Sequence, residues 1–223
     1  SKLSGHVTDI GFGAILGEDD AFMMSESHSD RRRRVETRIL PLVEGDIVRD
    51  WGMSPVTEVI FPYDPQIELV PESGLGNVLW PLRTLLSNRN DFGGRTYQDA
   101  GRAYWSYHQI PIDRNRIPLT ITFAEVATHN HFVLDRGGKV FKQTAPVIKL
   151  PAEASEDDHL SLLGLLNSST ACFWFQQVCH NKGGPGGGST KDEKWHDFYQ
   201  HAGTRVQEFP LPKQRPLELT RQL

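Results

Sequence analysis

The chain has 223 residues, of which 38% are hydrophobic and 23% are charged, and its formal net charge is −4. These values are typical of a soluble globular protein with one large domain or two small ones. The negative net charge argues against a uniformly basic nucleic-acid binder. No run of about 18 apolar residues occurs, which excludes a transmembrane helix of ordinary length.

The N-terminal segment begins with Ser1 and has no apolar stretch of the kind found in signal peptides. It also lacks an initiator methionine, so we expect the chain to be an excised part of a longer protein. Cys172 and Cys179 lie seven residues apart in an apolar stretch, which fits one face of a helix better than a disulfide or a zinc clip. Buried, unpaired cysteines imply a reducing, cytoplasmic setting.

The charges are unevenly distributed along the chain. Residues 1–73 have a net charge of −7, residues 74–150 of +5 and residues 151–223 of −2. A basic middle segment between acidic flanks can still form a surface that faces phosphates, because only the local field matters at contact distance. Ordinary solvated surface charge would give the same distribution, so the signal is weak.

The first third of the chain is irregular. Residues 7–16 and 56–61 have strand-like composition, and three glycines within 11–17 predict turns. The run Asp-Arg-Arg-Arg-Arg at 30–34 could touch phosphate, although a solvated helix or loop face is the more ordinary use of such a run.

Residues 76–90 are predicted to be helical, because leucines recur there at spacings of three and four. Aromatic residues then cluster at 97–108 and are mixed with arginines. Arginine can pair with a guanine edge or bind phosphate, and aromatic rings can stack on bases or fill a core. The basic aromatic stretch at 83–116 is therefore the best candidate for chemistry in this chain, with Trp105 and Tyr104 assigned mainly to the core.

Four short strands are predicted in the next segment, at 119–126, 132–135, 139–142 and 147–150. The Arg-Gly-Gly-Lys sequence at 136–139 predicts a hairpin-like connection between the second and third of them. Residues 119–150 are thus predicted to form a small antiparallel sheet.

The last third is predicted to be helical. Ser155 can cap a buried helix that contains Leu160 to Leu166, and Asn167-Ser168 predicts a break before a second helix. A glycine-rich loop at 180–190 precedes a third predicted helix at 191–201. Residues 206–211 could add an edge strand.

Catalytic motifs are missing or incomplete. No Asn-Pro-Pro-Tyr tetrapeptide is present to hold a flipped adenine, and the Gly11–Gly13 turn lacks the helix that a methyl-donor site would need. No nucleophile-elbow pattern supports a hydrolase. His129 and His131 could form half of a metal site, but no carboxylate or cysteine pair stands at ligand spacing in the sequence, so polar loop contacts are favoured and no metal site is predicted.

The glycine-rich loop contains Lys182, but this lysine precedes the glycines and the loop follows a helix. A Walker loop has the opposite order and follows a strand, so nucleotide binding is not favoured. The alternatives are a mobile loop that becomes ordered on DNA and a disordered connector.

Several segments together resemble the C-terminal region of the PglX family, the adenine-specific DNA methyltransferases of BREX/Pgl phage-defence systems. The resemblance lies in residues 123–150, in Leu-Leu-Gly-Leu-Leu-Asn-Ser-Ser-Thr-Ala-Cys-Phe-Trp-Phe at 162–175, and in the later segments 198–204 and 207–212. Residues 80–93 fit the same family, so that the resemblance covers roughly 5–212. The arrangement is also similar to specificity domains of type I and TaqI-like enzymes.

The resemblance implies a parent protein whose upstream catalytic domain binds S-adenosylmethionine and carries the Asn-Pro-Pro-Tyr motif. This chain lacks that motif, so it is expected to be inert alone, with no catalytic or cofactor-binding residues. Its implied role is to read a short DNA site and present the adenine. The expected partners are double-stranded DNA, the upstream methyltransferase domain and other BREX proteins, with no membrane. The rival hypothesis is an interaction module that docks other defence components or a phage inhibitor.

The predicted fold is α+β, a twisted and mostly antiparallel sheet with flanking helices and a C-terminal helical portion. The β-rich recognition region is assigned to residues 1–150 and the helical portion with the glycine-rich loop to 151–223, as one continuous unit. The candidate DNA-binding residues are basic, aromatic or amide side chains of the middle third and the glycine-rich loop: Arg83, Arg89, Arg95, Arg102, Tyr107, His108, His129, Asn130, Arg136, Lys139, Lys142 and Lys182.

Overall fold

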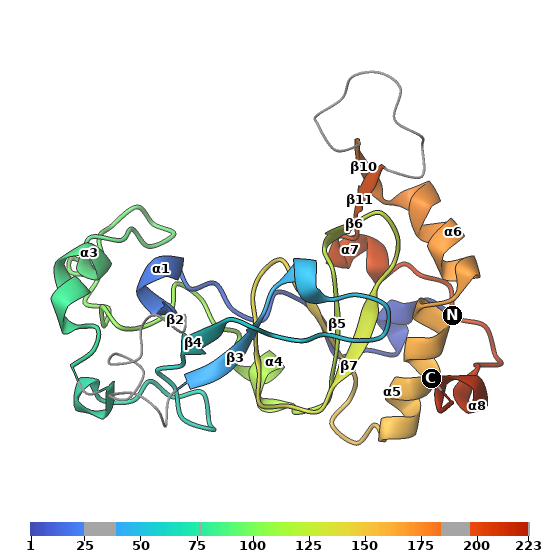
Figure 1. Ribbon diagram of the computed structural model, residues 1–223, viewed down its shortest axis with the longest axis horizontal. Helices are drawn as coiled ribbons and strands as arrows, with labels where there is room; N and C mark the ends of the chain where they lie inside the picture. The colour runs from blue at the N-terminus through green and yellow to red at the C-terminus, as the bar shows by residue number, and fades with distance from the viewer. Residues whose placement is uncertain (25–38, 76, 184–196, 223) are drawn as a thin grey trace.

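A computed structural model describes residues 1–24, 39–75, 77–183 and 197–222 of the protein. These residues form an α+β fold that is elongated in Figure 1, with two sheets beside each other along the long axis and the two longest helices at one end. The predicted fold class is confirmed. None of the described helices has the length and apolar character needed to cross a lipid bilayer.

The secondary-structure elements are short. The strands are β1 Asp9–Gly11, β2 Met23–Met24, β3 Ile39–Val43, β4 Glu58–Ile60, β5 Thr120–Phe123, β6 Val126–Ala127, β7 Phe132–Asp135, β8 Val140–Phe141, β9 Val147–Lys149, β10 His180–Gly183 and β11 Phe198–Gln200. The helices are α1 Asp19–Phe22, α3 Arg83–Ser87, α4 Ile112–Arg116, α5 Glu156–Leu166, α6 Ser169–Val178, α7 Gly203–Val206 and α8 Leu217–Thr220, with 3₁₀ turns η1 Leu3–Gly5, η4 Gly45–Ile47, η5 Glu72–Leu75 and η6 Trp80–Leu82.

One sheet has the strand order β1-β9-β5-β7, and each neighbouring pair in it is antiparallel. All four residues of β5 are buried, as expected for a central strand that is covered on both faces. Helix α5 packs against β5 and β7 and, with α6, closes the end of the molecule seen on the right of Figure 1. The predicted small antiparallel sheet is confirmed for β5, β7 and β9.

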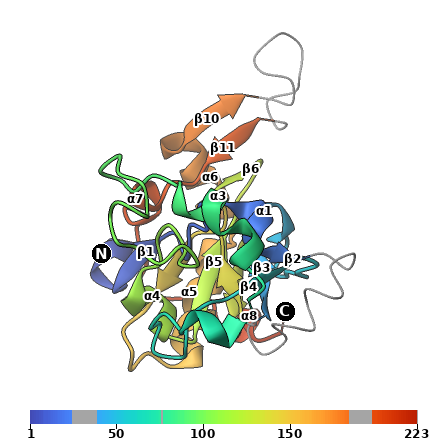
Figure 2. The same cartoon turned by 90° about the vertical axis from the view of Figure 1, so that its left-hand side faces the viewer.

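A second sheet has the order β2-β4-β3-β8, in which β8 runs parallel to β3 and the other pairs are antiparallel. A third, smaller sheet joins β10, β11 and β6. Figures 1 and 2 both show the β10–β11 hairpin projecting from the body of the protein.

The apolar side chains gather in two large cores and one small one. The first core lies around the β2-β4-β3-β8 sheet and includes Phe22, Ile60 and Tyr107. The second lies between the other four-stranded sheet and helices α5–α7 and includes Phe132 and Phe175. A small cluster around Phe141 and Val147 lies between them, so both sheets contribute to a shared interior.

Helix α5 begins with the predicted cap. The Ser155 hydroxyl accepts the Asp158 N–H at 3.2 Å, and the Asp158 carboxylate accepts the Ser155 N–H at 2.9 Å, which completes a capping box. Ser168 caps α6 in the predicted break between the helices. Cys172 lies in α6 and Cys179 follows it; both are free thiols, and burial raises the pKa of Cys179 to about 11.

Two predicted elements are wrong. The connection at 136–139 is not a hairpin, because β7 pairs with β5 while β8 pairs with β3 in the other sheet. Part of the helix predicted at 191–201 is instead the strand β11, which pairs with β10 and β6. Backbone hydrogen bonds to these two strands outweigh the local preference for helix. Residues 191–196 lie outside the described residues.

Other predicted elements are shorter than expected. The helix at 76–90 is reduced to η6 and α3, since Pro81 cannot donate a backbone hydrogen bond to a preceding turn. The edge strand at 206–211 amounts to a single bridge between Lys2 and Pro210. The domain division at residue 150 stays a prediction; Leu3 and Ile10 share the second core with α5 and α6.

Candidate nucleic-acid interface

Arg89 is a buried structural residue rather than a surface cation. It is 8% exposed, and its guanidinium donates to the carbonyls of Leu16, Tyr104, Leu86 and Ser106 at 2.8–3.0 Å. Burial lowers the pKa of Arg89. The geometry therefore removes Arg89 from the DNA-binding candidates, because its donors already join Leu16 and the turn at 104–106 to Leu86 in α3.

Tyr107 is also a core residue. It is 1% exposed, its ring meets Phe22 edge-on at 5.1 Å, and its hydroxyl donates to the Ile60 carbonyl at 2.6 Å. A base could stack on this ring only if the first core opened, so Tyr107 is no longer a candidate contact.

Arg102 and His108 lie around the buried ring of Tyr97. The Arg102 guanidinium is 4.2 Å from the ring centroid and donates to the carbonyls of Tyr107 and His108. The Tyr97 hydroxyl and His108 Nδ1 are 3.1 Å apart. Burial first, then the charges of Arg102 and Arg89, lower the pKa of the half-buried His108 imidazole.

Exposed aromatic and basic side chains occur together in the segment around α3, at the left end of Figure 1. The Arg83 guanidinium lies 4.2 Å from the centroid of the Trp80 ring, and Trp80 is 49% exposed. Leu85 and Phe92 are 51% and 74% exposed. Arg95 is exposed and paired with Asp91 at 3.1 Å. We call the segment 80–95 the α3 tip.

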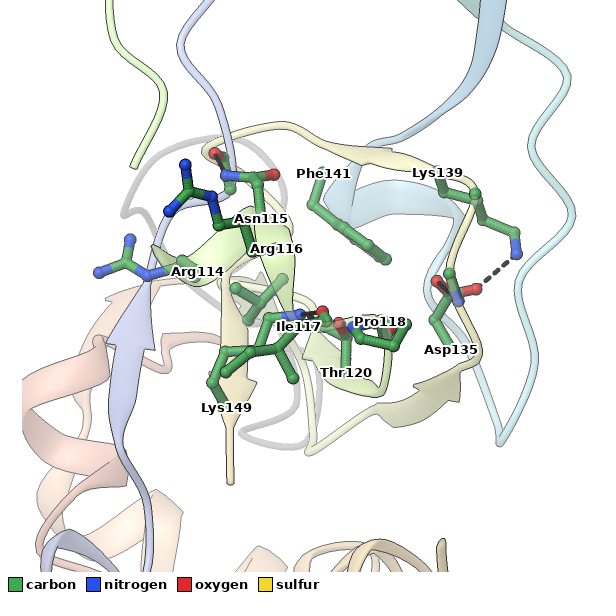
Figure 3. A pocket seen from close by; sticks show the side chains of 14 residues that line it. Arg114, Asn115, Arg116, Ile117, Pro118, Thr120, Asp135, Lys139, Phe141 and Lys149 are labelled. Carbon is green, nitrogen blue, oxygen red and sulfur yellow. Dashed lines mark hydrogen bonds and ion pairs between the residues drawn. The ribbon is translucent and has the colours of Figure 1, made fainter. Parts of the chain in front are cut away.

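A basic pocket of about 160 Å³ lies where α4 meets the ends of β5, β7 and β9. Among the described residues that line it are four basic side chains and one carboxylate: Arg114, Arg116, Lys139, Lys149 and Asp135. In Figure 3, Arg114 and Arg116 come from one side of the pocket and Lys139 with Asp135 from the other.

These cations are engaged by the protein itself. Arg114 donates to Asp9 at 2.7 and 2.9 Å, and Arg116 donates to the Gln66 carbonyl at 2.8 and 3.0 Å. Lys149 is 3% exposed and donates to Thr120 and to the Ile117 carbonyl. Burial lowers the pKa of Lys149 to about 8. Hydrogen bonds from these side chains thus hold α4 and the residue after it against the sheet. Arg114, Arg116 and Lys149 are not among the candidates predicted from the sequence.

Three further candidates are paired with carboxylates. Lys142 lies between Asp19 and Glu44 at 2.8 and 2.7 Å. Lys139 is paired with the buried Asp135. Arg136 is 64% exposed at its side chain and is paired with Glu156 at 2.5 Å. Lys182 is exposed on β10.

Asn130 and His129 lie in the β6–β7 connection with contrasting exposure. Asn130 is 8% exposed and donates to the Leu166 carbonyl at 2.5 Å, so it fixes the connection to the end of α5. His129 is exposed, and its ring centroid is 4.1 Å from that of His131. Asp50, far away in the sequence, lies against both imidazoles.

Five candidates therefore keep an exposed cation or imidazole: Arg83, Arg95, His129, Arg136 and Lys182. They do not form one cluster. α3 lies at one end of the molecule, whereas the β10–β11 hairpin projects from the other half (Figure 1).

Comparisons with known proteins bear on this surface. The chain is 45% identical over 218 residues to the adenine-specific methyltransferase PglX of Streptomyces coelicolor (strain ATCC BAA-471 / A3(2) / M145). The match covers 94% of this chain but 18% of that protein, so the chain spans less than a fifth of its relative's length. The chain matches no protein-family model.

Among solved structures, the chain is similar to the type IIL restriction-modification enzyme MmeI, whose structure was determined in complex with DNA. The TM-score is 0.58 with 12% sequence identity, over 90% of this chain and 24% of that one. A similarity at this level shows a shared fold.

Proposed function

We propose that this chain is the DNA target-recognition part of an adenine-specific DNA methyltransferase of a phage-defence system. The observation that carries the proposal is the 45% identity to PglX along nearly the whole chain. The chain corresponds to a small fraction of that protein and lacks the Asn-Pro-Pro-Tyr motif. Methyl transfer would therefore reside in another part of the longer protein, which would bind S-adenosylmethionine.

The fold shared with an enzyme that was solved in complex with DNA supports the same function. The exposed cations are suited to phosphate contact. Arg95 and Arg136 are each paired with a carboxylate at the surface, and such surface pairs contribute only about 0–1 kcal/mol. Exchange of the carboxylate for a phosphate would therefore cost little, and each new contact would release counterions from DNA.

The test is an exchange of segments. In the longer protein, residues 5–212 would be replaced by the corresponding segment of a homologue that methylates a different site. Methylated adenines would then be located by sequencing host DNA. We expect the chimera to methylate the donor's site. Methylation of the original site by an active chimera would overturn the proposal.

The second candidate function, a module that docks another defence protein, is favoured by one observation. Trp80, Leu85 and Phe92 each expose apolar surface on the α3 tip, and exposed apolar patches are typical of protein interfaces. Under this alternative, Trp80→Ala and Phe92→Ala would abolish binding to that protein while leaving the methylated sequence unchanged.

A further inference from the structure

The β3–β4 connection reaches from one sheet to the other. Its first part is held by the Gly45 N–H, which donates to Thr144, and Trp51 packs against the second core. Between these two anchors, Asp50 meets the β6–β7 connection, where its N–H donates to His131 Nδ1 at 3.2 Å. Two loops that are distant in sequence are thus brought together at one carboxylate and two imidazoles.

The three side chains present ligand atoms at close and similar distances. Asp50 Oδ1 is 3.4 Å from His131 Nδ1 and 3.8 Å from His129 Nε2, and the three ligand atoms all lie within 4.8 Å of one another. Zinc binds nitrogen and oxygen ligands at about 2.0–2.2 Å in tetrahedral geometry, which places neighbouring ligand atoms about 3.3–3.6 Å apart. Small side-chain movements would bring these atoms to that spacing.

We propose that Asp50, His129 and His131 form a binding site for a divalent transition-metal ion, of which Zn²⁺ is the best match. Two imidazoles and one carboxylate are a donor set that suits such an ion and leaves a fourth position open. Bound metal would join the β3–β4 connection to the β6–β7 connection and thereby stabilise the contact between the two sheets.

The surroundings of these ligands support the site. His129 Nδ1 is 3.1 Å from the Thr128 hydroxyl, so its other nitrogen is oriented toward Asp50 in the way that outer partners orient metal-binding histidines. His131 is 5% exposed and fixed by packing. A metal ion at Nδ1 would replace the long hydrogen bond from the Asp50 amide.

The backbone at the carboxylate is strained. Asp50 and Trp51 both have positive φ, 43° and 74°, although neither is glycine. Such conformations cost free energy and persist where the surroundings enforce them, frequently at ligand sites. Here the pair forms the tip of a tight turn that is closed by two backbone hydrogen bonds between Arg49 and Gly52, and the Asp50 carboxylate at this tip lies against the imidazoles.

A third imidazole lies nearby. His201 is 2% exposed, its Nδ1 has no hydrogen-bond partner among the described residues, and it is near enough to His131 and His129 to interact with them electrostatically. A buried polar atom left without a partner is uncommon, and a bound ion or water nearby is one of its ordinary explanations.

Metal binding can be tested on the purified chain after removal of metal by a chelator. Zn²⁺ would be titrated by calorimetry, and Co²⁺ would report coordination by its visible absorption. Asp50→Asn and His129→Asn are the test variants, because both side chains are exposed and asparagine tolerates the positive φ at position 50. Asp46→Asn, in the same connection, and His180→Asn, on β10, are matched exposed controls.

We expect one saturable Zn²⁺ site with a micromolar or lower dissociation constant. The dissociation constant should rise at least tenfold in both test variants and stay unchanged in both controls. Zn²⁺ should also raise the melting temperature of the unmodified chain but not of Asp50→Asn. Absence of saturable binding would overturn the proposal, as would equal affinity in the test variants, which would assign the metal to other histidines of the chain.

Discussion

At the scale of single residues, Arg89 and Arg102 act as internal hydrogen-bond donors rather than as surface cations. Arg89 and Arg102 donate to main-chain carbonyls that lie outside the named helices and strands, at Leu16 and within residues 104–108. A guanidinium has five N–H donors in a fixed plane, so it can satisfy several such carbonyls at once. The net charge of +5 for residues 74–150 therefore overstates the positive charge at the exposed surface of this segment.

Lys149 shows the same internal use of a cation, with a consequence for stability. Burial lowers the pKa of Lys149 to about 8, against an ordinary value near 10.5, although Asp135 opposes the shift. Between these two values the unfolded chain holds a proton that the folded chain has released. The contribution of Lys149 to the free energy of unfolding must therefore increase as pH rises from about 8 to 10.5.

Replacement of Lys149 by methionine should abolish that increase. The free energy of unfolding of the unmodified protein, relative to Lys149→Met, should rise between pH 7 and pH 10 by on the order of 3 kcal/mol at most, because one pKa unit corresponds to about 1.4 kcal/mol. Urea denaturation of both proteins at each pH measures the difference and cancels the contribution of tyrosines and Cys179. A pH-independent difference would contradict the assigned pKa.

At the scale of elements, the parts predicted correctly are those with local signals. α5 has an N-cap serine, acidic residues in its first turn and an apolar body, and β7 begins with Phe132 and Val133, both of which favour strands. These features act within a few residues, so the sequence displays them directly. The register that places β8 in a different sheet from β7 depends on packing between distant segments, which a local pattern does not contain.

The candidate site also combines features that the sequence displays directly with features that depend on the tertiary fold. Basic and aromatic residues could be located from the sequence, but their burial could not: Arg83 and Arg89 lie six residues apart, one exposed and one 8% exposed. Asp50 was missed as a partner of His129 and His131 because the two loops are joined only by the tertiary fold. The spacing of possible ligands along the chain argues against a metal site, but metal coordination depends on the distances between ligand atoms in the folded protein.

The contact between α5 and α8 depends on a glycine. A methyl group at Gly164 would overlap the Thr220 hydroxyl and lie 3.1 Å from the Pro216 ring. Although alanine favours helix more than glycine does, we expect Gly164→Ala to destabilise the protein by about 1–3 kcal/mol, the usual cost of overpacking. Thermal or urea unfolding measures this change.

A double-mutant cycle isolates the overlap. Thr220→Ala alone serves as the control, and Thr220→Ala combined with Gly164→Ala should recover most of the lost stability, because the overlapping hydroxyl is gone. Additive losses in the double variant would show that the α5–α8 packing is not the cause.

At the scale of the whole molecule, the small cluster around Phe141 and Val147 joins the two four-stranded sheets, because Phe141 lies in β8 of one sheet and Val147 in β9 of the other. α3 lies at one end of the molecule, and the β10–β11 hairpin projects from the other half (Figure 1). A recognition module that places phosphate contacts at both of its ends can fix the register of a duplex, while side chains between them read base edges.

The phosphate contacts themselves can be tested by salt dependence in the longer protein that contains this region. Each of Arg83→Ala, Arg95→Ala and Arg136→Ala should weaken binding to all duplex sequences and reduce the slope of log affinity against log salt by about one unit, since each would remove one released counterion. Arg221→Ala is a matched control, because Arg221 is 43% exposed at its side chain but lies on the C-terminal end between Asp157 and Glu218. Lys142→Ala should also leave the slope unchanged, because Asp19 and Glu44 already neutralise that ammonium.

An arginine that instead contacts a base edge would change preference at one position, by about 1–3 kcal/mol, rather than the slope for every sequence. If Lys142→Ala or Arg221→Ala reduces the slope while the three arginine variants do not, the DNA lies on another face; if all five leave duplex binding unchanged, this region does not supply the phosphate contacts and the docking function is the better account.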